Sequence, residues 1–173
     1  IIGVFDPGIF SIGDTLCAPG KKFQFDPIPT FAPEHFRRVR SLDTMKRKQF
    51  LKGMEQIAQE GAIQIFKTPY TGMEEVIVGV VGTLQFDVLE YRLKNEYNVE
   101  LYMEGLPYEY LRWIRSADGE PVKDEDLILG TDVKLVEDYK GNQLLLFGSQ
   151  WAIGWTQERN RDLTFYEFGG GIA

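Results

Sequence analysis

Cysteine and histidine are almost missing from this sequence: Cys17 and His35 are the single residues of their kinds among 173. One cysteine cannot form an intrachain disulfide or a cysteine-based zinc site, and one histidine excludes a histidine-rich metal site. Such sparse cysteine is typical of a reducing compartment, so we expect a cytoplasmic protein. We expect no bound metal.

Long apolar runs are missing too. No stretch of about 18 apolar residues occurs, so no membrane span is predicted. The N-terminus, IIGVFDPGIF, has no basic region and no small-residue cleavage site, which argues against a signal peptide. It also lacks an initiator Met and begins within an apolar strand pattern, which indicates a piece of a longer protein.

The motifs of catalysis are absent as well. There is no Gly-x4-Gly-Lys-Ser/Thr phosphate loop, and the run Gly169 to Gly171 has no helix after it. His35 has no nucleophile motif beside it, and Asp124 to Asp126 lacks the alternating spacing of a calcium loop. We therefore assign no catalytic residue and no cofactor to this chain.

The charge is acidic overall but unevenly distributed. The net charge is −7, yet seven cations between Arg37 and Lys52 face the single acid Asp43, a local charge of +6. A basic patch on an acidic body is typical of a protein that touches nucleic acid at one place. The candidate phosphate contacts are Arg37, Arg38, Arg40, Lys46, Arg47 and Lys48.

The other predictions rest on the segment from Glu75 to Glu104. The β-branched run Val76 to Val81 predicts a strand buried on both faces. Gly82 breaks it, Thr83 is placed to cap a helix that ends near Tyr97 and Asn98, and Val99 to Met103 alternates as a strand. Strand Val76 to Val81 has no aromatic residue on which an RNA base could stack, so an RNA-binding sheet surface is not indicated.

This helix has two apolar stripes, and one sheet can cover only one of them. The first stripe is Phe86, Leu89, Leu93 and Tyr97, and the second is Leu84, Val88 and Tyr91. The second is covered either by the rest of this chain or by another domain.

A strand, a helix and a further strand precede this segment. The segment His35 to Arg40 predicts a strand with Phe36 inward and the arginines outward. Asp43 is placed to cap a helix that ends at Gly61. Ala62 to Phe66 then alternates as a strand. The order β-α-β-β-α-β from Phe36 to Met103 is that of the ferredoxin-like (split βαβ) plait, an α+β fold.

The predicted organisation has three parts. Residues 1–30 read as short strands, the last of a truncated β-barrel domain, followed by a linker; 31–105 form the plait; and 106–173 form a second plait-like α/β unit or an extension of one mixed sheet. The third part is predicted from strands at Tyr108 to Arg115, Val133 to Asp138, Gln143 to Phe147 and Leu163 to Phe168, a helix from Ser149 to Arg159, and one or two helical turns within Pro121 to Leu129.

Several motifs together resemble translational GTPases of the elongation factor G type. They are Gly13-Asp14-Thr15-Leu16, Gly82-Thr83-Leu84-Gln85-Phe86-Asp87-Val88 and Glu96-Tyr97-Asn98-Val99-Glu100, in that order. Phe5-Asp6-Pro7-Gly8-Ile9-Phe10, Phe36-Arg37-Arg38-Val39-Arg40 and Lys52-Gly53 are similar to the bacterial class II peptide chain release factors. The resemblance covers nearly the whole chain.

This resemblance implies the C-terminal part of a GTPase that drives class I release factors off the ribosome after translation termination. GTP and Mg²⁺ would bind a GTPase domain outside this chain. The plait would contact the small subunit near protein S12 and 16S rRNA through Arg37, Arg38, Arg40, Lys46, Arg47 and Lys48. It would pack on its own GTPase and barrel domains through the start of the helix, namely Leu84, Gln85, Phe86, Asp87, Val88 and Tyr91.

Two alternatives stay open at this point. One is a fragment of an elongation factor G-like or ribosomal protection GTPase, although such proteins have a further domain after the first plait. The other is a free-standing ferredoxin-like module that binds a small ligand.

Overall fold

The computed structural model describes residues 2–5, 9–10, 12–25, 31–69 and 75–167, and these form an α+β fold. The elements in chain order are β1 (His35–Ser41), the 3-10 turn η1 (Thr44–Lys46), α1 (Arg47–Gln59), β2 (Gln64–Lys67), β3 (Glu75–Val80), α2 (Leu84–Tyr97), β4 (Leu101–Gly105), β5 (Tyr110–Ser116), the 3-10 turn η2 (Asp124–Asp126), β6 (Val133–Asp138), β7 (Gln143–Phe147), α3 (Gln150–Arg159) and β8 (Leu163–Tyr166).

All described strands belong to one antiparallel sheet with the order β4-β1-β3-β2-β6-β7-β5-β8. The first four strands with α1 and α2, here called the first unit, have the predicted ferredoxin-like order. The last four with α3, the second unit, repeat that order from the other side. The units join where β2 pairs with β6, at Phe66–Asp138 and Lys67–Glu137. The second unit thus has the strand order of a second plait, and it also extends one continuous sheet, which is antiparallel and not mixed.

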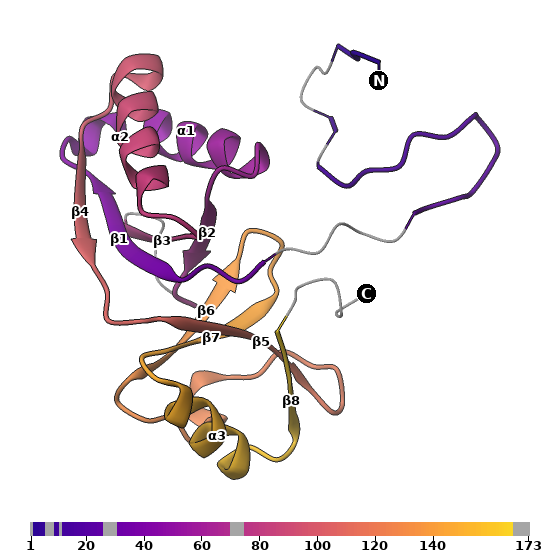
Figure 1. Ribbon diagram of the computed structural model, residues 1–173, viewed down its shortest axis with the longest axis vertical. Coiled ribbons are helices and arrows are strands. Elements are labelled where there is room, and N and C mark those ends of the chain that lie inside the picture. Colours follow the sequence, from indigo (N-terminus) through magenta and orange to yellow (C-terminus); the bar gives the residue numbers. More distant parts are fainter. Residues whose placement is uncertain (1, 6–8, 11, 26–30, 70–74, 168–173) are drawn as a thin grey trace.

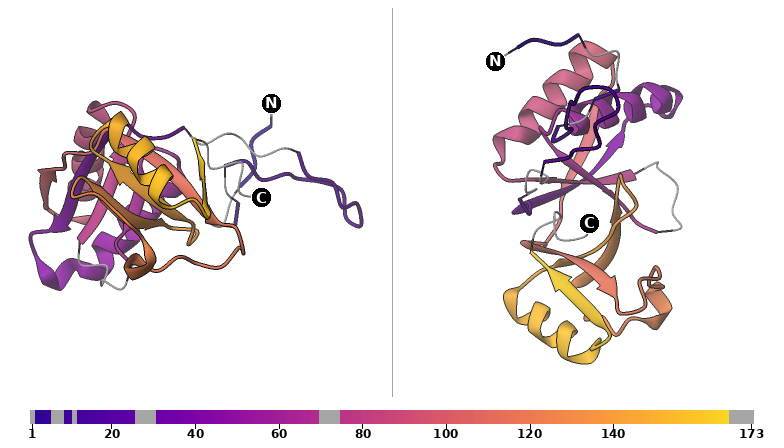
Figure 2. Two further views of the ribbon diagram at one scale, coloured as in Figure 1. Left: turned by 90° about the horizontal axis from the view of Figure 1, so that it is seen from below. Right: turned by 90° about the vertical axis from the view of Figure 1, so that its right-hand side faces the viewer.

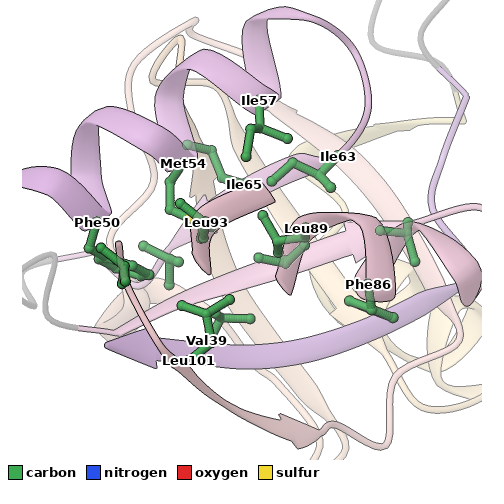
Figure 3. Packing of buried hydrophobic residues seen from close by; sticks show 14 residues of the cluster. Val39, Phe50, Met54, Ile57, Ile63, Ile65, Phe86, Leu89, Leu93 and Leu101 are labelled. Carbon is green, nitrogen blue, oxygen red and sulfur yellow. The ribbon is translucent and has the colours of Figure 1, made fainter. Parts of the chain in front are cut away.

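Each unit buries one sheet face beneath its own helices. In the first unit α1 and α2 cover that face, and Met54, Leu89 and Leu93 meet Val39 and Ile65 of the strands (Figure 3). In the second unit α3 covers a face that includes Leu145 and Phe147. Alternate residues of each strand point to the opposite face.

Those opposite faces pack against each other in the middle of the molecule. The residues of this central core are Phe36, Phe66 and Ile77 from the first unit and Leu111, Trp113, Val136, Leu144 and Leu146 from the second. The layers are therefore helices, sheet, sheet and helix, with α1 and α2 at one end and α3 at the other (Figure 1). Because each half of the sheet is covered on both faces, β3 reads as a continuous apolar run.

Gly61 marks the end of helix α1 as the sequence predicts, whereas the predicted N-cap Asp43 caps the 3-10 turn that precedes α1. Asp43 Oδ1 accepts a hydrogen bond of 2.9 Å from the backbone N–H of Met45, which caps η1 and leads into α1. Gly61 has φ +75°, and its N–H donates to the carbonyl of Ala58 at 2.9 Å. Glycine suits this left-handed position because it has no Cβ to clash.

The start of α2 differs from the prediction, because the Thr83 side chain makes no capping hydrogen bond. The side chain of Gln85 makes the capping hydrogen bonds instead. Its Oε1 accepts from the N–H groups of Val81 (3.1 Å) and Gly82 (2.9 Å), and its Nε2 donates to the carbonyl of Ala62 at 2.6 Å. Thr83 has helical φ and ψ, so its side chain does not point back at the first turn as a cap does.

The second unit has no counterpart of α1 among its described residues. The segment between β5 and β6 contains only η2 as regular structure, yet it covers the sheet with Val122, Leu127 and Leu129. Two amide side chains hold it in place: Gln143 bonds both backbone groups of Val122, at 2.6 and 2.7 Å, and Asn160 does the same for Ile128, at 2.9 and 3.0 Å. The helical turn predicted within Pro121 to Leu129 is confirmed as η2.

The N-terminal segment contains no strand in its described residues 2–5, 9–10 and 12–25, so the short strands predicted there are not formed in this structure. A strand needs a partner for its backbone hydrogen bonds, and this segment extends beside the folded units (Figures 1 and 2). Ile2, Phe5 and Ile9 are 74–90% exposed. Gly169 to Gly171 lie outside the described residues.

Gly53 allows α1 and α2 to pack closely. A Cβ at this position would overlap Leu93 Cδ2 and lie 2.9 Å from Tyr97 Cδ2. We predict that Gly53→Ala destabilises the chain by about 1–2 kcal/mol, because crowding exceeds the gain in helix propensity. Urea unfolding measures this. The matched control is Gly154→Ala in α3, where no atom lies within 4 Å and the change should stabilise; a stabilised Gly53→Ala variant would contradict the packing argument.

Candidate functional site

The arginines of β1 do not share one face of the sheet. Strand alternation places Arg37 with Val39 on the side of α1 and α2, and Arg38 and Arg40 with Phe36 on the opposite side. The predicted arrangement, with Phe36 inward and all arginines outward, is therefore wrong. The arginines lie on both faces because both faces of this strand are buried: Phe36 on one face is 3% exposed, and Val39 on the other is 0% exposed.

Arg37 packs against the start of α2. Its guanidinium lies 4.3 Å from the ring centroid of Phe86, and Phe86 is itself 1% exposed in the core of the first unit. A cation over an aromatic face is attracted by the ring quadrupole. The Phe86 ring thus supports the guanidinium of Arg37 and is itself almost fully buried.

Arg38 and Arg40 contact the edge strand β4. Arg38 Nη1 lies 3.4 Å from Glu104 Oε2, and the Arg40 guanidinium lies 4.6 Å from the ring centroid of Tyr102. Both pairs are direct cross-strand neighbours in the β1–β4 register. These contacts hold the two cations along the outer edge of the sheet.

The other cations lie where η1 meets α1. Lys46 Nζ donates to the carbonyl of Asn98 at 2.6 Å, at the C-terminal end of α2, where the helix dipole favours a positive charge. Arg47, Lys48 and Lys52 are exposed on the first two turns of α1.

The six predicted contacts consequently fall into two groups. Arg37 stands at the start of α2 and Lys46 at its end, and twelve residues of helix separate Phe86 from Asn98, about 18 Å. A phosphate held by Arg37 is therefore out of reach of Lys46. Arg37 and Lys46 are close in sequence, but the rest of the extended strand β1 lies between them and separates them in space.

Helix α2 carries an exposed apolar face on its outer side. Leu84, Val88 and Tyr91 are 76%, 48% and 69% exposed, and Val81 beside them is 51% exposed. The first stripe is buried except for half-buried Tyr97, so the described part of this chain does not cover the second. Asp87 is exposed, whereas Gln85 is occupied in holding the start of the helix.

A groove of about 860 Å³ lies between the two units and was not predicted from the sequence. Its lining includes His35, Arg37 and Thr83 from the first unit and Tyr108 and Arg112 from the second. Burial raises the pKa of the Tyr108 hydroxyl above its ordinary value. The groove exists because the β4–β5 connection passes over the start of β1, a long-range contact with no local sequence signal.

The described residues form neither a metal-binding cluster nor a membrane-spanning helix. No group of three or more histidine, cysteine or acidic side chains is arranged to hold a metal ion there. None of the described helices has the length and apolar character that crossing a bilayer requires.

Residues 25–157 match the sequence model of the family described as "Class II release factor RF3, C-terminal domain". The chain belongs to this family. The match includes both units up to α3, so the double plait is the fold of this release factor domain.

Curated relatives agree. The chain is 47% identical over 165 residues to "Peptide chain release factor 3" of Symbiobacterium thermophilum, covering 95% of this chain and 30% of the relative. It is 44% identical over 163 residues to the protein of that name from Listeria monocytogenes, covering 94% and 30%, and 42% identical over 167 residues to that of Staphylococcus saprophyticus, covering 96% and 31%. The chain thus spans about a third of the length of these relatives.

Proposed function

We propose that this release factor domain is the ribosome-binding part of a GTPase that dissociates class I release factors after translation termination. The family match over residues 25–157 carries this proposal. GTP and Mg²⁺ would bind the part of the parent protein that this chain does not include, and the complex would act on the cytoplasmic ribosome.

The ribosome contact falls on the exposed cations of α1. Lys48 and Lys52 are four residues apart, so they lie on one helix face, and both are exposed. No ion pair involves either of them among the described residues. Arg47 lies on the same turn. Such cations gain affinity for phosphate by releasing counterions, which suits 16S rRNA near protein S12 on the small subunit.

Contact with the rest of the parent protein falls on apolar surfaces. The exposed face of α2 (Leu84, Val88 and Tyr91) would pack on the GTPase or barrel domain. The exposed apolar side chains within residues 2–5, 9–10 and 12–25 would complete the barrel, where their backbone would find strand partners. Both surfaces would exclude water on docking.

The cationic surface is tested in the full-length parent protein with Lys48→Glu and Lys52→Glu together. We expect ribosome affinity to fall by about tenfold at 100 mM salt, and the salt dependence of binding to become shallower, because phosphate contacts are lost. Cosedimentation across a salt series measures both quantities. These lysines are preferable to Arg37, whose replacement would also disturb its packing on Phe86.

The matched control reverses Lys123 and Lys140, two exposed lysines of the second unit. Binding should then change by less than about twofold. Equal losses in both double variants would mean that total charge matters and not the surface of α1.

The apolar face of α2 is tested with Leu84→Ser and Tyr91→Ser together. We expect the isolated chain to melt within about 2 °C of the unchanged chain, because both side chains are mostly exposed. The full-length parent should lose several degrees, since docking against its other domains is weakened. Calorimetry measures the melting temperature of both proteins, and the double variant Ile128→Ser with Tyr139→Ser is the control. An unchanged melting temperature of the parent protein would refute this docking face.

A further inference from the structure

Helix α3 lies at the end of the molecule far from α1 and α2 (Figure 1), and it carries two neighbouring tryptophans, Trp151 and Trp155. Trp151 is 71% exposed, and its ring centroid lies 6.3 Å from that of Trp155. The Arg159 guanidinium lies 4.4 Å from the Trp155 ring centroid. The packing of α3 uses Ala152 and Thr156 instead, so the fold does not need Trp151 in this place.

Gly154 lies beside Trp151 on the same outward face, three residues along the helix. A glycine in a helix interior costs about 1 kcal/mol relative to alanine. Neither conformation nor crowding demands it, since its φ is not positive and a Cβ there would have no atom within 4 Å. A bare stretch of helix backbone next to an exposed tryptophan is what close approach by a partner requires.

The charges around this face disfavour RNA. Glu158 follows Gly154 by one helical turn, and Asp132 lies at the start of the helix, where its carboxylate accepts from Ser149 Oγ at 3.4 Å. Residues 106–167 hold twelve acidic and seven basic side chains. Two cations lie nearby: Arg159 is stacked on Trp155, and Arg161 donates to the backbone carbonyl of Glu158 at 3.4 Å, so the acidic excess belongs to the second unit as a whole. Phosphates would therefore meet net repulsion.

We propose that Trp151, Gly154 and Glu158 form a docking surface for a basic protein segment on the ribosome. One lysine or arginine of that segment stacks on the exposed ring of Trp151 and a second one pairs with Glu158, two helical turns further on, while the backbone of the segment passes over Gly154. This inference rests on the proposed function, which names the ribosome as the assembly. It gives α3 a protein partner, whereas the proposed partner of α1 is RNA.

Two variants of the full-length parent protein test the surface in cosedimentation with purified ribosomes. Trp151→Ala should weaken binding by about tenfold, as truncation of an interface tryptophan does. Gly154→Ala should weaken binding while raising the melting temperature of the chain by about 2 °C, a combination that loss of folding cannot produce. Tyr139→Ala, an exposed aromatic of the β6–β7 turn, is the control and should change neither.

A photo-reactive benzoylphenylalanine at position 151 identifies the occupant on the ribosome. A crosslink to a lysine- or arginine-rich peptide of a ribosomal protein supports the proposal. A crosslink to ribosomal RNA or to the parent polypeptide itself overturns it, as does normal binding by both Trp151→Ala and Gly154→Ala. If the unchanged parent protein does not cosediment with ribosomes, the proposed function and this docking surface both fail. If the unchanged parent cosediments, the variants test the docking surface alone.

Discussion

The packing of one sheet half on the other is the interaction on which the rest of this structure depends. Each plait alone would leave an apolar sheet face in water, and Phe66, Trp113 and Leu144 show how completely those faces are buried, at 0–3% exposure. The backbone pairing between β2 and β6 covers only two residue pairs and could not hold the units by itself. Hydrophobic burial in the central core therefore makes the two plaits one body.

This constraint fixes where the outer surfaces can lie. Because the sheet faces meet in the middle, the helices must cover the two opposite ends, so the cations of α1 and the apolar face of α2 stand on one end and the tryptophans of α3 on the other. Distinct surfaces at the two ends suit the proposed role, in which separate faces of the domain would contact the rest of the parent protein and the ribosome. The argument for those partners is the family to which the chain belongs, together with the chemistry of each surface.

Local patterns predicted most of the elements but not the long-range contacts. The ranges Val133 to Asp138 and Gln143 to Phe147 match β6 and β7, because alternation and a turn signal are local. The burial of both faces of β1 depends on a second sheet half that lies about seventy residues later in the chain, so no local pattern around Arg37 and Arg38 can show that they lie on opposite faces. The capping by Gln85 differs, because its bonds to the N–H groups of Val81 and Gly82 are local and only its bond to the carbonyl of Ala62 is long-range. Thr83 is the residue that the sequence preference for N-caps favours, and the structure uses Gln85 instead.

Native-state hydrogen exchange of the isolated chain tests the central claim most directly. If the central core unites the plaits, the slowest amides of β3 and of β7 should exchange with the same free energy of opening, and Leu144→Ala should lower both by about 2–4 kcal/mol. The contrary result is a variant in which β7 loses protection while β3 keeps its own, because the two plaits would then unfold as independent domains.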